Sequence, residues 1–270
     1  MIRGSASAKI NLALVVGPLR EDGRHEVATV MQRIDLADRL ELERADELRI
    51  DGFADDTLVH DALVRFADAA GVGARWRARI EKRVPVAAGL GGGSSDAATA
   101  LRLANELADR PLADLHDVAV SLGADVPFFL REGPQLATGT GTELQPLNLP
   151  QDYWIVLALP NGAAKESTAA VYARFDERDG ADAFEQRRGA LLERLAHVRR
   201  SADLALLPPN DLASSPLADR LRAAGAFRAD VSGAGPAVYG LFVRETDARS
   251  AAAGLERDAR VWITVPAWYG

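Results

Sequence analysis

The sequence predicts an α+β fold in two parts, and three observations lead to this expectation. Apolar residues alternate in several short segments of both halves, which is the pattern of β-strands. Segments with the helical spacing of apolar residues lie between them, and a polar, turn-rich stretch follows residue 130. We therefore divide the chain near Pro150, into residues 1–150 and 151–270.

The composition is that of a globular protein with a sizeable core: 48% of the 270 residues are hydrophobic and 26% are charged. Cysteine is absent, which excludes disulfides, thiolate zinc sites and cysteine nucleophiles. No apolar run approaches the roughly 18 residues that a membrane span requires, and the N-terminal residues lack the apolar core of a signal peptide. We expect a cytoplasmic protein with no membrane partner.

The charge balance favours small-molecule partners. A formal net charge of −7 argues against nucleic acid, because its binding usually needs a basic face. A phosphate ligand must then be held by local positive potential, from backbone N–H groups, a helix N-terminus or single cations. The basic residues are nearly all arginine, so Lys9, Lys82 and Lys165 can mark sites that need a compact ammonium. A chance result of base composition is the alternative.

The first predicted element is a half-buried strand over residues 5–16, where the apolar residues alternate. Lys9 and Asn11 share the opposite face as a polar pair. A lysine that simply faces solvent is the alternative interpretation. A turn is expected at residues 21–23.

The other elements follow from the same two spacings. The first half has strand-like segments at 27–34, 38–43, 47–51 and 76–80, suggesting an antiparallel sheet, and helical spacing at 58–70, 95–107 and 112–122. Gly71 is the expected end of the first helix. In the second half we expect a strand at 153–159, a strand pair within 227–243 and a strand at 260–265, with helices near 167–176, 183–200 and 246–258 and one further helix before the strand pair.

The most informative segment is PVAAGLGGGSSDAATAL at residues 85–101. Its glycines and small residues lie between a strand and an alanine-rich helix that is expected to begin at about Ser95, with Asp96 as a capping residue in its first turn. Glycines let the backbone approach a ligand, and successive N–H groups at a helix N-terminus bind phosphate. The segment therefore predicts a phosphate-binding loop, with a flexible linker as the alternative.

Two common phosphate-binding patterns do not fit this loop. The Walker A pattern needs a lysine after its last glycine, where this chain has Ser94. The dinucleotide-binding fingerprint needs a glycine where Ser94 stands.

Several segments, in order over nearly the whole chain, resemble the GHMP kinase superfamily. They are AKINLAL (8–14), REDGRHEVATV (20–30), GLGGGSSDAA (89–98), GADVPFFL (123–130), STAAVY (167–172), NDL (210–212) and VSGAGPAVYGLF (231–242). The triple-glycine loop resembles the form found in the family that phosphorylates 4-diphosphocytidyl-2-C-methyl-D-erythritol. Other members of the superfamily usually carry a shorter loop.

The resemblance implies a GHMP kinase fold. Residues 1–150 would form a domain like domain 2 of ribosomal protein S5 that carries the ATP-binding loop, and residues 151–270 a ferredoxin-like domain. It also implies an ATP-dependent kinase acting on the 2-hydroxyl group of that substrate in non-mevalonate isoprenoid biosynthesis. Mg²⁺ is expected to accompany the nucleotide, without a dedicated metal cage of protein ligands. The oligomeric state is left open, a homodimer included.

The resemblance gives Asp125 and Lys9 the catalytic roles. Asp125 would accept the proton of the substrate hydroxyl, and Lys9 would orient Asp125 and attract the γ-phosphate. From the residues alone, Asp125 is more simply a turn residue before Pro127.

The resemblance also assigns the nucleotide-binding residues. They are Lys82, Ala88, Gly89, Gly91, Gly92, Gly93, Ser94 and Ser95, with Ser95 a candidate Mg²⁺ ligand. A solvated lysine at a strand end is the alternative for Lys82. The segment from Gly233 to Pro236 is expected to form a turn that braces the loop, although a simple β-turn has the same sequence.

The implied substrate residues are Asn11, Arg24, His25, Thr168 and Tyr172. Asn11 would bind polyol hydroxyl groups, His25 the cytosine edge, and Tyr172 one face of the base, with Thr168 on the same helix face. An exposed loop histidine and a core tyrosine are the alternatives.

Arg24 departs from the family, which usually has a stacking tyrosine at this position; a planar guanidinium can also stack on a ring. This departure leaves two other functions open. One is another GHMP kinase, acting on homoserine, mevalonate or a sugar, and the other is a non-catalytic nucleotide-binding module.

Overall fold

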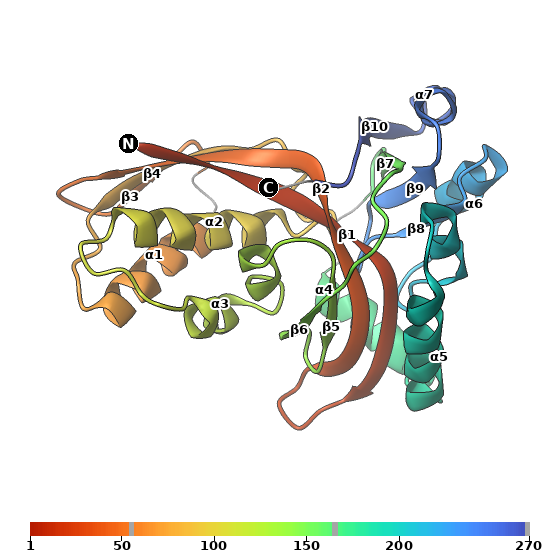
Figure 1. Ribbon diagram of the computed structural model, residues 1–270, viewed down its shortest axis with the longest axis horizontal. Coiled ribbons are helices and arrows are strands. Elements are labelled where there is room, and N and C mark those ends of the chain that lie inside the picture. The colour runs from red at the N-terminus through yellow and green to blue at the C-terminus, as the bar shows by residue number, and fades with distance from the viewer. Residues whose placement is uncertain (54–56, 164–166, 268–270) are drawn as a thin grey trace. The chain divides into compact units, whose positions relative to one another are not determined.

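The computed structural model describes residues 1–53, 57–163 and 167–267 (Figure 1). The chain forms two compact units. The first comprises Met1–Ala8, Leu36–Val86 and Gly91–Glu132, and the second Lys9–Asp35, Ala87–Leu90 and Gly133–Gly270. These units do not coincide with the predicted division at residue 150, because the long strands β1 (Ile2–Leu19) and β2 (His25–Arg44) run through both.

The sheet of the first unit is built on the C-terminal part of β2. This part pairs antiparallel with β4 (Trp76–Glu81), and β3 (Arg49–Asp51) pairs parallel with β4. Alternate residues of β4 are buried, beginning with Trp76, as the alternation predicted. The expected antiparallel sheet is confirmed for β2 and β4 and is wrong for β3.

The helices of the first unit lie along one side of these strands in Figure 1. They are α1 (Thr57–Ala70), α2 (Gly92–Leu107), α3 (His116–Leu122) and the 3₁₀ helix η1 (Pro127–Leu130). Helix α1 packs against α2 and α3, α2 contacts η1, and the rings of Phe66 and Trp76, 5.8 Å apart, join α1 to β4. As predicted, α1 ends at Gly71, which has a φ of 65°.

A short hairpin opens the C-terminal part of the second unit. Strand β5 (Gln135–Thr138) pairs with Thr29–Met31 of β2, and β6 (Glu143–Pro146) pairs with β5. The sequence indicated only a polar, turn-rich stretch here. Each strand has four residues, too few to establish a periodicity.

The rest of the second unit is a four-stranded antiparallel sheet in the order β10-β7-β9-β8. Its strands are β7 (Trp154–Pro160), β8 (Arg228–Val231), β9 (Val238–Phe242) and β10 (Ala259–Thr264). Helices α6 (Pro216–Ala223) and α7 (Glu245–Ala253) share one apolar core with this sheet. With a helical region between β7 and β8 and α7 between β9 and β10, this is the ferredoxin-like arrangement that was predicted.

Between β7 and β8 the chain forms α4 (Thr168–Asp176), α5 (Phe184–His197) and the 3₁₀ helix η2 (Ser201–Leu206), followed by α6. Several predicted boundaries are wrong: β1 runs from Ile2 to Leu19, β2 is one strand instead of two, α2 begins at Gly92, α3 begins at His116, α5 ends at His197 and α7 ends at Ala253. Asp35 is exposed and Leu36 and Ala37 are half-buried, which explains why the sequence predicted two strands in place of β2.

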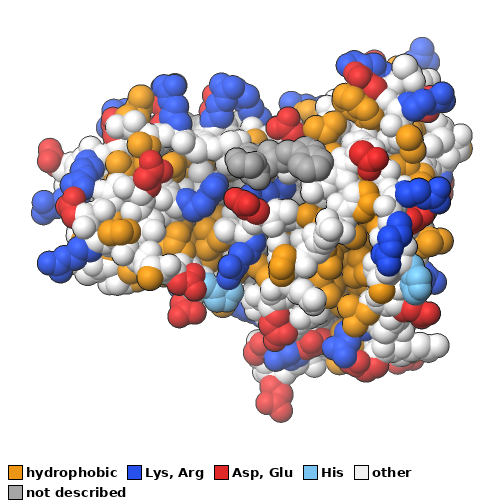
Figure 2. Space-filling view, viewed as in Figure 1, with side chains coloured by type: hydrophobic (Ala, Val, Ile, Leu, Met, Phe, Trp, Pro, Cys, Tyr) orange, Lys and Arg blue, Asp and Glu red, His pale blue; other side chains and the backbone are white. Residues whose placement is uncertain are grey.

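No helix in the described parts of the chain is long and apolar enough to cross a membrane. On the face shown in Figure 2, basic and acidic side chains lie interspersed. An anionic ligand is therefore attracted to that face by individual groups close to it more than by a large area of positive potential.

Candidate active site

Lys9 and Asn11 are buried polar residues of β1, each with 4% of its surface exposed. The Lys9 Nζ donates a hydrogen bond to Asn11 Oδ1 at 2.7 Å, and Asn11 Nδ2 donates to Thr29 Oγ1 of β2 at 2.8 Å. The interpretation of Lys9 as a solvent-facing strand lysine is therefore wrong. Burying an ammonium is costly unless partners compensate it, so this position points to a specific role.

The glycine-rich segment lies directly beside Lys9. The Lys9 N–H donates to the carbonyl of Leu90 at 2.9 Å. Two neighbouring carbonyls accept hydrogen bonds from the third glycine-rich motif: Ala88 from the N–H of Ala237 at 3.1 Å, and Gly89 from the Ser232 hydroxyl at 2.9 Å. The donors are Ser232 and Ala237, which flank the turn predicted at residues 233–236, so the loop is braced by the residues on either side of that turn.

Gly89 cannot be replaced without strain. Its φ is 79°, and a Cβ at this position would lie 2.1 Å from the backbone oxygen of Ser232. Only glycine allows both this backbone conformation and this approach of two main chains.

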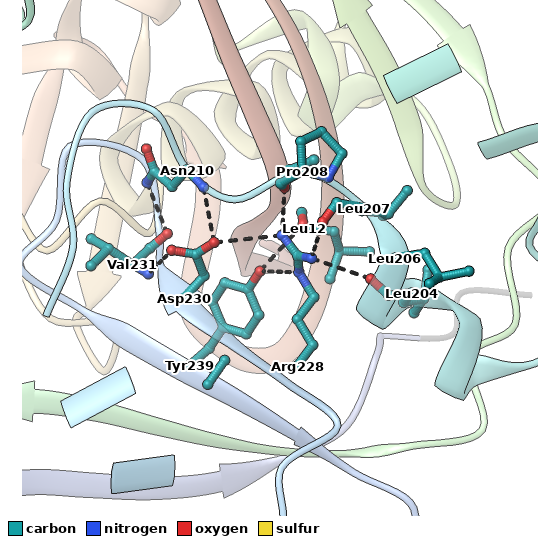
Figure 3. A network of polar contacts seen from close by, with 12 residues as sticks. Leu12, Leu204, Leu206, Leu207, Pro208, Asn210, Arg228, Asp230, Val231 and Tyr239 are labelled. Atoms are coloured by element: carbon teal, nitrogen blue, oxygen red, sulfur yellow. Dashed lines mark hydrogen bonds and ion pairs between the residues drawn. The ribbon is translucent and has the colours of Figure 1, made fainter. Parts of the chain in front are cut away.

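Asn210 fixes the turn of the third motif (Figure 3). Its Nδ2 donates to the carbonyls of Val231, at 2.9 Å, and Gly233, at 2.6 Å. A Cβ on Gly233 would lie within 3.6 Å of both Asn11 Oδ1 and Lys9 Nζ, so Asn210 holds the backbone that closes around Lys9.

Asn210 is held in turn by a buried ion pair that the sequence did not reveal (Figure 3). Asp230 accepts hydrogen bonds from the N–H groups of Asn210 and Val231 and lies 3.5 Å from a guanidinium nitrogen of Arg228. Burial raises the pKa of the Asp230 carboxyl, although Arg228 and the two N–H groups act in the opposite direction.

Arg228 distributes its other donors over neutral acceptors. These are the carbonyls of Leu204, Leu207 and Pro208 and the hydroxyl of Tyr239. Burial raises the pKa of Tyr239 to about 12, so its hydroxyl stays protonated. A sequence signal existed: Arg228 and Asp230 alternate with the apolar Ala229 and Val231, which enter the core under α6 and α7.

His25 and Tyr172, two residues to which the resemblance assigns substrate contacts, lie next to each other. Their ring centroids are 4.8 Å apart, with an interplanar angle of 30°. The His25 Nδ1 lies 3.0 Å from the Gly17 carbonyl and Nε2 lies 3.4 Å from Asp176 Oδ2. His25 is buried, so the alternative of an exposed loop histidine is wrong.

Arg24 and Thr168 are exposed, and Tyr172 is half-buried. Arg24 follows the predicted turn, where its N–H donates to Asp22 Oδ1 at 3.1 Å. Thr168 and Tyr172 both lie on α4, which begins after Ser167 as N-cap residue. Lys165 lies outside the described residues.

Helices α4 and α5 are attached to β1 through Asp211, in the NDL segment. Asp211 Oδ2 accepts from the Val16 N–H at 2.9 Å and from Arg187, and the Arg187 guanidinium also donates to the Val16 carbonyl at 3.0 Å. Burial raises the pKa of Asp211, despite the opposing Val16 N–H and Arg187 charge. The Arg178 guanidinium, just after α4, donates to the Asp211 carbonyl. Val171 and Phe175 of α4 share an apolar cluster with Leu14 and Val16 of β1, and these contacts fix the helix that carries Tyr172.

In the first unit, the glycine-rich segment continues as the N-terminus of α2. Gly91 is the N-cap residue, and no side chain caps the helix. The first N–H groups of a helix have no partners within it, so Gly92, Gly93 and Ser94 begin a region of positive potential. These three residues are half-buried, whereas Ser95 is buried.

Asp96 is not the capping residue that the sequence predicted, because α2 begins earlier and places this residue in its second turn. It is fully buried and forms a triad with Lys82 and Asp38 instead. The Lys82 Nζ donates to Asp96 Oδ2 at 2.6 Å and to Asp38 Oδ2 at 2.5 Å. Burial alone would lower the pKa of Lys82, but the charge of Asp96 and the hydrogen bonds to both carboxylates raise it. A solvated strand-end lysine is excluded; contact of Lys82 with a nucleotide stays a prediction.

Asp125 lies in the turn between α3 and η1 and is half-buried. The N–H of Val126 donates to the carbonyl of Gly123 across this turn, and Pro127 starts η1. Because η1 contacts α2, the first unit positions the Asp125 turn against the helix that begins at the glycines. Lys9 belongs to the second unit, and its pairing with Asp125 stays a prediction.

No group of three or more His, Cys, Asp or Glu side chains in the described ranges is placed to hold a metal ion. A metal that arrives with a nucleotide needs few protein ligands, since Mg²⁺ retains several waters. The hydroxyl of Ser95, at the start of α2, suits such a minor role.

Comparisons with known proteins agree with the motifs. The sequence model described as GHMP kinases N terminal domain matches residues 57–133, and GHMP kinases C terminal matches residues 181–260. A 4-diphosphocytidyl-2-C-methyl-D-erythritol kinase of Chlorobium phaeovibrioides is 40% identical, covering 93% of this chain and 91% of that protein. The corresponding kinase of an Anaeromyxobacter species is 41% identical, covering 92% and 84%.

Solved structures give the same result. The crystal structure of a 4-(cytidine 5′-diphospho)-2C-methyl-D-erythritol kinase is 35% identical, with a TM-score of 0.81 over 99% of this chain and 100% of that one. The mevalonate kinase of Methanococcus jannaschii, at 14% identity and a TM-score of 0.74, covers 99% of this chain and 98% of its own and shares the fold.

Proposed function

The chain belongs to the GHMP kinases, in the family of 4-diphosphocytidyl-2-C-methyl-D-erythritol kinases, and from this premise we propose that it transfers the γ-phosphoryl group of ATP to the 2-hydroxyl of that substrate. The observation that carries the proposal is the buried Lys9, whose main chain is bonded to Leu90 of the glycine-rich segment and whose ammonium is bonded to Asn11. The product would be an intermediate of non-mevalonate isoprenoid biosynthesis, made in the cytoplasm.

Phosphoryl transfer requires mainly positioning and charge stabilisation, because its transition state is loose. In the proposal, the N–H groups at the start of α2 bind the phosphates of ATP, together with residues 88–93 of the loop. Lys9 stabilises charge that develops on the transferred phosphoryl group. Mg²⁺, bound to the nucleotide, would neutralise phosphate charge, with Ser95 as its nearest protein ligand.

Asp125 is the proposed general base. The substrate oxygen attacks the γ-phosphorus, the bond to the ADP oxygen breaks, and the hydroxyl proton passes to the carboxylate. A carboxylate is a weak base, so the proton is expected to move late, after the attacking oxygen has become acidic.

The cytidine end is assigned to His25, Tyr172 and Arg24. The stacked arrangement of His25 and Tyr172 supports a joint role for them at a planar base. Arg24, exposed on the neighbouring turn, would place its guanidinium plane on the base where relatives carry a tyrosine. Asn11 and Thr168 would contact the polyol.

A substrate panel tests the reaction. Purified protein with ATP and Mg²⁺ should consume 4-diphosphocytidyl-2-C-methyl-D-erythritol and leave homoserine, mevalonate and simple sugars unchanged. Consumption of one of those alcohols in its place would assign a different GHMP kinase activity. Tight binding of ATP with no transfer to any alcohol would make the protein a nucleotide-binding module.

The substitution Asp125→Asn tests the general base. We expect turnover to fall by about 100-fold or more, while ATP binding changes little, because the amide keeps the shape and loses the basicity. Asp117→Asn, at an exposed position of the preceding helix, is the matched control. Wild-type turnover of Asp125→Asn would remove this residue from the proposed role.

A further inference from the structure

A third buried side chain, Thr29, continues the polar pair of Lys9 and Asn11. Thr29 lies on β2 and is 5% exposed. Its Oγ1 accepts from Asn11 Nδ2 at 2.8 Å and donates to the carbonyl oxygen of Ala13 at 2.7 Å. No role was predicted for this residue from the sequence. It connects strand β2 to the ammonium of Lys9 through one amide group.

Lys9, Asn11, Thr29 and Ala13 form a row of hydrogen bonds, and the groups at its two ends determine the direction of each bond. The Ala13 carbonyl can only accept, so the Thr29 hydroxyl must donate its single hydrogen there. The Thr29 oxygen is then an acceptor toward Asn11, and the Asn11 atom facing it must be the NH₂ group. At the other end, the Lys9 ammonium can only donate, so the Asn11 atom facing it must be the carbonyl oxygen.

These two requirements agree, which is informative because the two ends of an asparagine amide have nearly the same shape. With the opposite orientation, the NH₂ group would face the ammonium, and two donors would meet in a buried site. Lys9 and Thr29 thus each disfavour the flipped orientation, Thr29 because its oxygen, whose hydrogen is donated to Ala13, would then face the amide oxygen of Asn11. One N–H of Asn11 goes to Thr29, and among the described residues the other has no protein partner, so it is available to a ligand oxygen.

We propose that Thr29 is a positioning residue of the phosphoryl-transfer site: it fixes the amide of Asn11 so that the carbonyl holds the Lys9 ammonium and the second N–H is presented to an oxygen of the alcohol substrate. This inference rests on the roles proposed above for Lys9 and Asn11. A purely structural Thr29 would only satisfy its own hydroxyl on Ala13, which needs no contact with Asn11.

The test compares Thr29→Val, which keeps the shape and removes the hydroxyl, with Thr29→Ser, which keeps the hydroxyl. We expect Thr29→Val to lower kcat about 10- to 100-fold, the scale of a hydrogen bond to a charged group, and to leave KM for ATP within about threefold. Thr29→Ser should retain activity within about threefold of wild type. Equal activity of Thr29→Val and wild type, or equal loss in Val and Ser variants, would overturn the proposal.

A double-mutant cycle separates positioning from general damage. If Thr29 acts through Asn11, then adding Thr29→Val to an Asn11→Ala protein should cost less than about twofold further in kcat. If instead the loss of kcat in the double variant equals the product of the losses in the two single variants, Thr29 acts independently of Asn11. That result would contradict the inference. Thermal unfolding of each variant shows whether it is folded. If the valine variant does not fold, Thr29→Ala replaces it, with the same expected loss of kcat.

Lys9→Ala distinguishes failure of this inference from failure of the proposed function. An inactive Lys9→Ala protein together with a fully active Thr29→Val protein would reject only the role of Thr29. An active Lys9→Ala protein would reject the proposed site and with it this inference.

Discussion

Two cations, the half-buried Lys82 and the buried Arg228, support the glycine-rich segments, and they do so by different chemistry. In the first unit, Lys82 lies between the carboxylates of Asp38 and Asp96, both fully buried, next to the start of α2. In the second unit, Arg228 lies 3.5 Å from one carboxylate and donates to three carbonyls and a hydroxyl. The lysine site depends on opposite charge, whereas the arginine site depends on the geometry of a planar fork.

Because of this difference, substitution of the cation should destabilise the two sites in different ways. Two carboxylates around one ammonium leave an excess of one negative charge, which the N–H groups of Arg83 and Val84 partly offset through Asp38. Removing the ammonium would leave two buried anions. Removing the fork of Arg228 would instead leave several carbonyls unpaired, each at a smaller cost.

The largest expected effect is that of Lys82→Met. Because it leaves Asp38 and Asp96 buried without their counter-ion, we expect the free energy of unfolding to fall by about 3–5 kcal/mol. Urea denaturation measures this, with Arg79→Met, an exposed position of β4, the strand that ends just before Lys82, as control. A loss under about 1 kcal/mol would mean that charge pairing does not distinguish the two sites.

Arg228→Lys breaks the second site while keeping its charge. A lysine cannot reproduce the fork, so we expect a loss of about 1–3 kcal/mol in the free energy of unfolding and a higher KM for ATP, since Asn210 and Gly233 lose their support. Arg244→Lys, at an exposed ion pair with Asp247, should change stability by less than about 0.5 kcal/mol. If Arg228→Lys behaves like this control, the geometric description of the site is wrong.

The smallest effect is a difference in pH dependence. Asp230 has a raised pKa, so the folded protein binds this proton more tightly than the unfolded chain, and stability falls as the pH rises from about 4 through that pKa. Lys82 also has a raised pKa, so its contribution is complete below about pH 10 and is lost above it.

Unfolding measured across pH 4 to 7 distinguishes the two sites. The stability difference between wild type and Asp230→Asn should shrink as the pH rises through this range. The difference between wild type and Lys82→Met should instead grow as the pH rises, because the two buried carboxylates left without their counter-ion bind protons more tightly in the folded variant than in its unfolded chain. The reverse pattern would contradict the assignment of the two pKa shifts.

Elements with a clear periodicity were predictable from the sequence. The alternation predicted β4 correctly, because burial alternates along a strand that has helices on one face. Gly71 predicted the end of α1 correctly, because glycine readily adopts the positive φ at which many helices end. The four-residue strands β5 and β6 gave no such signal. The start of α2 was missed because glycines and serines have low helix propensity, yet tertiary contacts extend the helix back to Gly92.

The candidate site was predictable only in part. The placement of Lys9 and Asn11 on one face followed from the alternation in the first strand. Their burial did not, because that strand was expected to be half-buried and is buried on both faces over residues 6–17. Asp125 had no signal beyond the family resemblance, because an aspartate before proline is common in turns. The network of Arg228, Asp230 and Asn210 was missed, since its contacts join segments distant in sequence and include main-chain carbonyls that the sequence does not distinguish.

The course of β1 has a consequence for dissecting the protein. Its residues beyond Lys9 belong to the second unit, where Leu14 bridges to Asn210 and Ala88 pairs with Ala237. A polypeptide cut at residue 150 would therefore keep Lys9 and the loop but lose the partners from the later half. Such a fragment would expose unpaired strand edges, so it is a poor candidate for separate expression, and split versions of this protein should need both pieces to be synthesised together.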